Sequence, residues 1–393
     1  MSPIADDRRR PALAVLAGGN FAQLGVRLLL GALVPFVLLT FDASKSAVGL
    51  ALTGMWATYA LLQFPSGVLA DRFGERPLVI LGLGGAVVGS ILVGLSPTLL
   101  VFGVFTLLLG AGTGLYFAPA TALISRSYEE RGGPIGMLTA TGAAAGVVFP
   151  AAGSLLGASI GWRPVLWIAG GVTLLFLLAI YRWVPSVPPA NPTRSLGRIA
   201  ELSRHRELLG RPSVAYTTVV AVMVGFAFQA FSSFFPTFLV EYRGTSAGLA
   251  GVLFGIAFGL STLAQPVAGG LSDRVGRDGA IALSVVLFVS GLLVLLGIGS
   301  WPGLLVGVTL LGTGVSWPGS VQARFMDQLS DAERGYGFGL ARTVYMGLAS
   351  AGSVVVGTLA EAGGWILGYG AVALLLILCL VVLATNRVMG LDL

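Results

Sequence analysis

Charged residues are the scarcest component of this chain. They make up 10% of its 393 residues, whereas hydrophobic residues make up 55% and the mean hydropathy is +0.91. A soluble domain carries roughly 25% charged residues. The composition therefore excludes a large soluble core and indicates a chain that lies mostly within a membrane.

Cysteine and histidine each occur once. Cys379 lies inside the last apolar run, which rules out a disulfide within the chain and predicts a buried, inert thiol. His205 lies in the longest polar segment, where we expect a solvated surface residue. The sequence has no cluster of metal ligands, no nucleophile beside a base and no phosphate-binding loop. We therefore expect no metal, no cofactor and no enzymatic activity.

Lysine also occurs once, as Lys45, and every other Lys or Arg position is an arginine. The arginines form no stripe interleaved with aromatic residues on a polar domain, so we expect no nucleic-acid partner. Seventeen of them fall in alternate polar segments that share one side, while the other side holds only Lys45, Arg163 and Arg243. Under the positive-inside rule, this asymmetry predicts a multi-pass protein of the cell inner (cytoplasmic) membrane with both termini cytoplasmic.

Twelve apolar runs are long enough to cross a membrane, since a spanning helix needs about 20 residues. They cover residues 12–40, 47–70, 77–96, 98–124, 133–159, 162–184, 213–240, 246–270, 279–299, 302–327, 335–361 and 364–386. The longest polar segment, 185–212, separates an N-terminal half, 1–184, from a C-terminal half, 213–393. Apolar residues in the second part of this linker recur near helical spacing against a basic face, which predicts a short helix on the membrane surface.

A charged motif interrupts the apolar runs twice. GVLADRFGER occupies 67–76, and GGLSDRVGRD occupies 269–278. Each copy is typical of a tight turn between two spans, in which glycine allows close backbone approach and aspartate can cap the start of the next helix. The pair Gly161-Trp162 likewise recurs as Gly364-Trp365. The repetition predicts parallel halves related by an axis along the membrane normal.

The repeated pattern G-x-x-x-D-R-x-G-x-R resembles the loop signature of the major facilitator superfamily. The resemblance implies an all-α polytopic membrane protein with twelve transmembrane helices in two pseudo-symmetric six-helix halves around a central cavity. It also implies a secondary transporter of small solutes that works by alternating access. Glu75 departs from the pattern, which prefers a basic residue there.

The same resemblance implies conformational roles for the motif. We expect its residues to fasten the ends of the two halves through helix starts and nearby arginines. Arg342 in the eleventh span is expected to be a gating or structural partner of the Asp71 loop, whereas Arg324 should snorkel or pair structurally. The expected gating residues are Gly67, Asp71, Arg72, Gly74, Arg76, Gly269, Asp273, Arg274, Gly276 and Arg342.

Arg27 is the clearest candidate for chemistry, because it lies near the middle of the first span. An arginine at a helix centre costs at least about 2.5–3.5 kcal/mol to insert, so it is by default a functional hypothesis. Asn20, Gln23 and Arg27 are three and four residues apart, which places them on one helix face. No aspartate or glutamate lies at the middle of a span. A central positive charge without an acid favours an organic or inorganic anion as substrate.

Polar and aromatic side chains elsewhere complete the predicted substrate site. Tyr116 and Trp317 rank highest among them, since each lies close to a mid-span proline and helix breaks free backbone groups beside cavities. The predicted substrate-binding residues are Asn20, Gln23, Arg27, Tyr59, Tyr116, Gln229, Trp317 and Tyr345.

Two further family signatures are incomplete. Thr106 stands where the fourth-span signature has an arginine with a proposed role in proton transfer. The fifth span has glycines at Gly133, Gly142 and Gly146, but Val147 replaces the Gly-Pro step of the antiporter pattern. Gly142 and Gly146 also suit a close helix-packing face. An exporter of hydrophobic compounds driven by proton antiport is thus the main alternative, and a non-transporting membrane sensor a minor one. The expected partners are a small-molecule substrate and the lipid bilayer, with protons or another counter-ion left open, and we expect a monomer.

Overall fold

The computed structural model describes residues 6–128, 132–193, 195–330 and 333–391. Within these ranges the chain is helical and contains no strand. Eleven continuous helical segments are long and apolar enough to cross a membrane. The last, Arg334–Met389, holds 56 residues and turns at Gly363 and Gly364, where the backbone leaves helical geometry, so it supplies two spans. The prediction of an all-α protein with twelve spans is confirmed.

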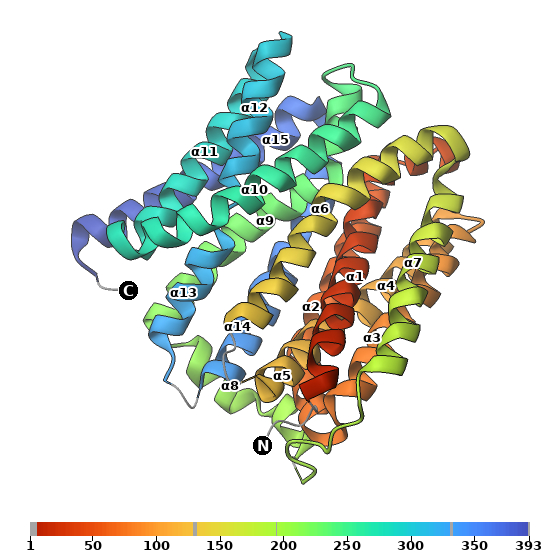
Figure 1. Ribbon diagram of the computed structural model, residues 1–393. Coiled ribbons are helices and arrows are strands. Elements are labelled where there is room, and N and C mark those ends of the chain that lie inside the picture. Colours follow the sequence, from red (N-terminus) through yellow and green to blue (C-terminus); the bar gives the residue numbers. More distant parts are fainter. Residues whose placement is uncertain (1–5, 129–131, 194, 331–332, 392–393) are drawn as a thin grey trace.

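The helices form two halves joined by a linker (Figure 1). The N-terminal half consists of α1 (Asp6–Phe41), α2 (Lys45–Phe73), α3 (Glu75–Gly94), α4 (Leu99–Gly114), α5 (Phe117–Ser127), α6 (Gly132–Ile160) and α7 (Trp162–Trp183). The linker contains η1 (Leu196–Ala200) and α8 (Leu202–Leu209). The C-terminal half consists of α9 (Pro212–Glu241), α10 (Ala247–Val275), α11 (Arg277–Gly297), α12 (Trp301–Gly314), α13 (Pro318–Gln328), α14 (Arg334–Ala349) and α15 (Ala351–Met389).

The fourth and tenth spans are each broken into two helices. α4 ends at Gly114 and α5 begins at Phe117, just before Pro119, while α12 ends at Gly314 and α13 begins at Pro318. Proline lacks a backbone N–H and cannot continue the hydrogen-bond ladder of a preceding helix. The predicted breaks beside the two prolines are therefore present.

The repeated charged loops consist of a single linking residue each. Gly74 has φ 97° and Gly276 has φ 84°, a left-handed region that glycine adopts without strain. Asp71 and Asp273 lie in the last turns of α2 and α10, and the glycines themselves occupy the cap positions of α3 and α11. The prediction that aspartate caps the next helix is therefore wrong, because the preceding helix continues past it.

The linker helix α8 lies at one end of the bundle, which we call the linker end (Figure 1). Gly74 lies near the linker, because a Cβ added to it would be 3.6 Å from the Val187 carbonyl oxygen. The predicted short helical segment of the linker is thus present as η1 and α8. His205 packs between the rings of Phe64 on α2 and Tyr336 on α14, at centroid distances of 5.7 and 5.8 Å. The prediction of a solvated histidine is wrong, since the linker docks against both halves. Of the arginines in the charge asymmetry, Arg131 and Arg194 lie outside the described residues, as do the side chains of Arg8, Arg9, Arg198 and Arg204.

At the opposite end, called the far end, the two halves touch through their backbones. A Cβ added to Gly31 on α1 would overlap the Ser232 carbonyl oxygen of α9. One added to Gly49 on α2 would lie 2.7 Å from the Ser353 carbonyl oxygen of α15. Small residues permit this approach, as is usual where membrane helices pack closely.

Polar contacts join the same end of the two halves. The Lys45 ammonium lies 3.0 Å from the Glu241 carboxylate, which also accepts a hydrogen bond from the Trp365 indole at 3.0 Å. Ser46 donates its backbone N–H and its hydroxyl to Glu361 at 3.0 and 2.6 Å. The only lysine of the chain thus contributes to closing the far end.

The seam between α6 and α10 is also tightest towards the far end. A Cβ added to Gly255 would lie 2.6 Å from the Val147 carbonyl oxygen, and Gly146 faces the Phe258 ring. Towards the linker end, a Cβ added to Gly136 or Gly269 would meet nothing within 4 Å. The predicted packing role of Gly146 is therefore present in the structure.

We expect Gly31→Ala to open the far end. The added methyl group would overlap a backbone oxygen, which cannot rotate away as a side chain can, so α1 and α9 must separate. Leu39 is 82% exposed and Gly299 is exposed on the other half, so both can carry spin labels as cysteine variants. The distance between these labels, measured by pulsed electron paramagnetic resonance, should lengthen in Gly31→Ala.

Gly171→Ala in α7 is the matched control, because an added Cβ there has no atom within 4 Å. Label distances that are equal in the two alanine variants would contradict the assignment of Gly31 to the closed end.

A second prediction concerns the docking of the linker. Arg211 donates two hydrogen bonds to Glu333, at 3.1 and 2.7 Å, and this pairing lowers the pKa of Glu333 to about 2. A depressed pKa means that the pair stabilises the docked linker above the ordinary glutamate pKa of about 4.3 and is lost as pH falls through about 2. Between pH 5 and 8, the contribution of the Arg211–Glu333 pair to hydrogen-exchange protection of α8 should therefore stay constant.

Glu333→Gln should lower that protection several-fold at pH 7, as measured by exchange mass spectrometry. Asp42→Asn, an exposed carboxylate at the far end, serves as the control. Unchanged protection in Glu333→Gln would mean that the pair does not hold the linker.

Candidate functional site

The polar stripe of α1 forms a hydrogen-bond chain that ends at Arg27. The Asn20 amide donates to the Leu138 carbonyl of α6 at 2.7 Å, and the Gln23 amide donates to Asn20 at 2.8 Å. The Gln23 side-chain oxygen then accepts from Arg27 Nη2 at 3.0 Å. Both amides, for which we had predicted substrate contacts, are engaged with the protein in this conformation, and they orient Arg27.

The Arg27 guanidinium lies between a polar helix face and two aromatic rings of α2. Its central carbon is 3.6 Å from the Tyr59 ring centroid and 4.9 Å from that of Trp56. Arg27 is 2% exposed, and its Nη1 has no hydrogen-bond partner. In the part of the chain that the structure describes, no carboxylate forms an ion pair with Arg27.

Arg342 reaches the same place from the C-terminal half. Its guanidinium carbon lies 4.8 Å from the ring centroid of Phe117 on α5, and its Nε lies 3.5 Å from the Met346 sulfur. Its helix α14 packs against α2, where the Phe64 backbone N–H donates to the hydroxyl of the adjacent Thr343 at 3.2 Å. The structure thus brings Arg342 to Phe117 of the N-terminal half, where we had predicted a partner of the Asp71 loop.

The other predicted binding residues do not all gather here. The Tyr345 ring stacks on that of Phe325, with the ring centroids 6.1 Å apart. Trp317 packs against Phe228 at 6.5 Å.

Two predicted binding residues have structural partners instead. Tyr116 is fully buried within the N-terminal half and donates its hydroxyl to the Leu16 carbonyl at 2.6 Å. Gln229 is buried and accepts a hydrogen bond from Ser232. We leave Tyr116 and Gln229 out of the site.

Phe117 is a site residue that the sequence did not single out. It directly follows Tyr116 at the break between α4 and α5. The break was recognisable from Pro119, but which of the two rings turns inward depends on how α5 is rotated about its axis.

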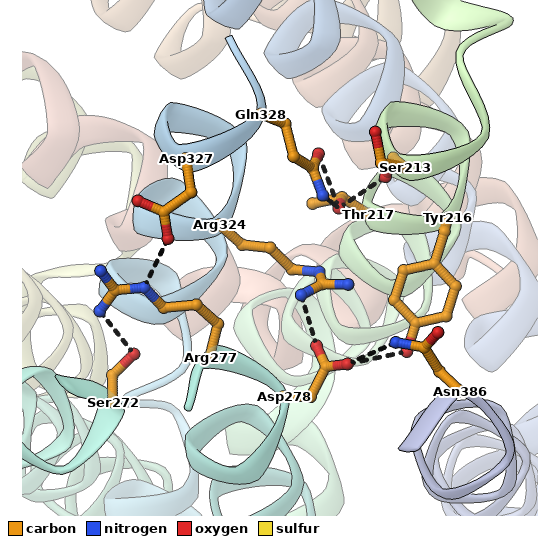
Figure 2. Close-up of polar contacts among 10 residues, drawn as sticks. All are labelled: Ser213, Tyr216, Thr217, Ser272, Arg277, Asp278, Arg324, Asp327, Gln328 and Asn386. Atoms are coloured by element: carbon orange, nitrogen blue, oxygen red, sulfur yellow. Dashed lines mark hydrogen bonds and ion pairs between the residues drawn. The ribbon is translucent and has the colours of Figure 1, made fainter. Parts of the chain in front are cut away.

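At the linker end, the second charged loop forms a three-residue ionic chain. Arg277 donates to Asp273 at 2.5 Å and to Asp327 at 2.8 Å, so it joins the last turn of α10 to the end of α13. We had predicted that Arg274 is a gating residue, and the ion pairs of this loop among the described residues are made by Arg277. Arg277 also contacts Ser272, as Figure 2 shows.

The first charged loop is held by the linker and by α7. The Asn191 backbone N–H donates to the Asp71 carbonyl at 2.8 Å, and Arg76 donates to the Tyr181 carbonyl at 2.8 Å. The Arg72 guanidinium lies 5.5 Å from the Phe73 ring centroid. Gly67, like Gly269, would have no neighbour within 4 Å of an added Cβ, so neither glycine makes the expected close backbone approach in this conformation.

One carboxylate, half-buried Asp278 or buried Glu75, pins the linker end of each half. Asp278, at the start of α11, pairs with Arg324 of α13 at 3.0 Å. Its other oxygen accepts from Tyr216 of α9 at 3.3 Å and from Asn386 of α15 at 3.0 Å (Figure 2). Arg324 thus has the structural role that we predicted for it.

In the N-terminal half, Glu75 at the start of α3 pairs with Arg126 of α5 and is 1% exposed. Glu75, the residue that departs from the family pattern, therefore forms an ion pair with an arginine of α5. In the second half, Asp278 forms the corresponding ion pair with an arginine of α13. An acid at a helix start also interacts favourably with the helix dipole.

Asp273→Asn should slow transport far more than it weakens substrate binding. The substitution removes one charge from the Arg277 chain at the linker end, remote from Arg27, so it shifts the balance between conformations and leaves the binding groups in place. Initial rates in proteoliposomes and affinity in detergent, measured on the same preparation, separate the two effects.

Asp42→Asn provides the control, since this carboxylate is exposed at the far end. Transport by Asp273→Asn at the rate of Asp42→Asn would remove the gating role of the second loop.

The chain matches known proteins along most of its length. The profile of the Major Facilitator Superfamily matches residues 15–277 and 218–388. The voltage-gated purine nucleotide uniporter SLC17A9 of Homo sapiens is 28% identical over 268 residues, which cover 64% of this chain and 60% of that protein. The class C tetracycline resistance protein of Escherichia coli is 30% identical over 295 residues, which cover 71% of this chain and 72% of that protein. The chain thus spans less than two thirds of the uniporter's length.

Among solved structures, a bacterial homologue of the human lysosomal transporter Spinster, in an inward-facing and unoccupied conformation, matches with a TM-score of 0.81. Its sequence is 16% identical, and the match covers 97% of both chains. The profile match, the relatives and the helical fold agree: this chain belongs to the Major Facilitator Superfamily.

Proposed function

We propose that this chain is a secondary transporter that moves a small anion by alternating access, and that Arg27 is the charge that binds it. The observation that carries the proposal is the state of the Arg27 guanidinium, which is 2% exposed and leaves Nη1 without a partner. A buried charge is ordinarily paired. Here the missing partner would be the substrate.

The energetics agree with this assignment. Insertion of an arginine at the membrane centre costs at least about 2.5–3.5 kcal/mol, while a cation–π contact returns about 0.5–2 kcal/mol. Tyr59, Trp56 and Gln23 therefore hold Arg27 without neutralising it. An arriving anion would accept charge-assisted hydrogen bonds, which are stronger than neutral ones.

The proposed site lies between the two halves. Arg27, Tyr59 and Phe117 belong to the N-terminal half, while Arg342 and Tyr345 belong to the C-terminal half. An anion that contacts both sides would bind some relative positions of the halves better than others, and only such differential binding can shift a conformational equilibrium. We take residues 1–184 and 213–393 to be the moving units and 185–212 to be their tether.

We also propose the membrane, the orientation and the working unit of the protein. The arginine asymmetry supports a linker end and both termini on the cytoplasmic side of the cell inner membrane. With the far end closed, the substrate would exchange with the cytoplasm in this conformation. We propose a monomer as the working unit, with protons or another ion as coupling partners.

One curated relative supports the anion class by its own function, since SLC17A9 is a purine nucleotide uniporter and nucleotides are anions. A second candidate function is export of hydrophobic compounds by proton antiport. The 30% identity to a tetracycline resistance protein and the rings of Phe228 and Trp317 favour it.

Variants of Arg27 distinguish these functions. Arg27→Lys keeps the charge but loses the planar fork, so the affinity for a transported anion should fall by about 1–3 kcal/mol, the usual value of a hydrogen bond to a charged group. Arg27→Gln should lose anion binding while the protein still folds. Calorimetric affinity and melting temperature are measured on both variants.

Arg163→Gln is the matched control, because Arg163 also lies against an aromatic ring, at 4.6 Å from Trp162, but at the far end. If Arg27→Gln bound anions normally and only melted at a lower temperature, Arg27 would be structural and the exporter would become the leading function.

A further inference from the structure

Arg27 and Arg342 bring two uncompensated positive charges from the two halves towards one region of the bundle. The Arg27 guanidinium carbon lies 3.6 Å from the ring centroid of Tyr59 on α2, and the Arg342 guanidinium carbon lies 4.8 Å from that of Phe117 on α5, with its helix α14 packed against α2. Neither arginine takes part in an ion pair among residues 6–128, 132–193, 195–330 and 333–391. Their other contacts are neutral, which distinguishes them from the paired arginines at the ends of the bundle.

The charges of this site repel each other, and like charges repel more strongly in a membrane interior than in water. A monoanion bound between them would leave a net positive charge. A dianion would neutralise both, so the arrangement favours a ligand with two negative charges.

Arg27 and Arg342 do not use all their N–H donors in contacts with the protein, so donors remain for such a ligand. Arg27 uses Nη2 and Nε towards Gln23 and keeps Nη1 free. Arg342 uses Nε towards the Met346 sulfur, a weak acceptor. Guanidinium groups bind the oxygens of phosphate and carboxylate in a planar, two-pronged fashion.

We infer that the substrate is a small organic dianion, such as a phosphate monoester, held between Arg27 and Arg342 with the Tyr59 hydroxyl as a further donor. The inference rests on the proposed function and goes beyond it, because a carrier of monoanions would need only Arg27.

The test compares phenyl phosphate with phenyl sulfate. The two esters have nearly the same shape, but the phosphate has a second pKa near 6 and carries about two charges at pH 7.5, whereas the sulfate carries one at any working pH. The side chains that contact the two guanidinium groups in the described structure are Gln23, Met346 and the rings of Trp56, Tyr59 and Phe117, of which Tyr59 alone is titratable. A change in relative affinity between pH 5 and 7.5 therefore reports the protonation of the ligand.

For the intact protein in detergent, we expect phenyl phosphate to bind about tenfold or more tightly than phenyl sulfate at pH 7.5, and this ratio to approach one at pH 5. Arg342→Gln should remove the preference and leave sulfate binding in place, while Arg342→Lys should keep it. Melting temperatures show whether each variant is folded, and Arg163→Gln is the control for loss of an arginine elsewhere.

The outcomes separate the two claims. Equal binding of the two esters at pH 7.5, or tighter binding of the sulfate, would overturn the dianion and leave an anion carrier. A preference that survives in folded Arg342→Gln would also overturn it. If neither ester bound, the proposed anion carrier itself would fail.

Discussion

A positive charge held at the centre of the membrane without a counter-charge is the constraint on which this structure depends. Arg27 must be oriented, shielded from lipid and yet left unpaired. The chain meets these demands with neutral groups: an amide chain from Leu138 through Asn20 and Gln23, and the rings of Trp56 and Tyr59. An acid at any of these positions would satisfy the arginine permanently and compete with an arriving anion.

The acids among the described residues are instead confined to the ends of the bundle, where each strong pair joins separate helices. Glu75 and Asp278 pin the linker end of the two halves, and Glu241 pairs with Lys45 at the far end. The centre therefore keeps its positive charge, while the ends keep the halves rigid and in register. This separation of charges is the physical basis for treating the centre as a binding site and the ends as fastenings.

Much of the architecture followed from the sequence, because it depends on local signals. Apolar length predicted the spans, Pro119 and Pro318 marked the broken helices, and the repeated glycines marked single-residue turns. The placement of side chains did not follow as well. The spans are apolar on most faces, so their rotation about their own axes leaves little trace in the sequence, and that rotation turned Tyr116 into the N-terminal half.

Contacts between distant segments were the other limit. Arg342 is close in sequence to the linker end, and only the packing of α14 against the N-terminal half reveals that it reaches Phe117. The same applies to His205, whose two ring partners come from different halves. By contrast, the position of Asn20, Gln23 and Arg27 on one helix face was predictable, since a single helix supplies all three residues.

The central claim is that an anion completes the coordination of Arg27. The most direct measurement is a diffraction experiment on crystals soaked in selenate, whose selenium is located by anomalous scattering. The account predicts a selenium peak within hydrogen-bonding reach of Arg27 Nη1, on the side that faces Arg342. A structure of the soaked protein in which Nη1 bonds to a protein group and no selenium lies beside it would contradict the account.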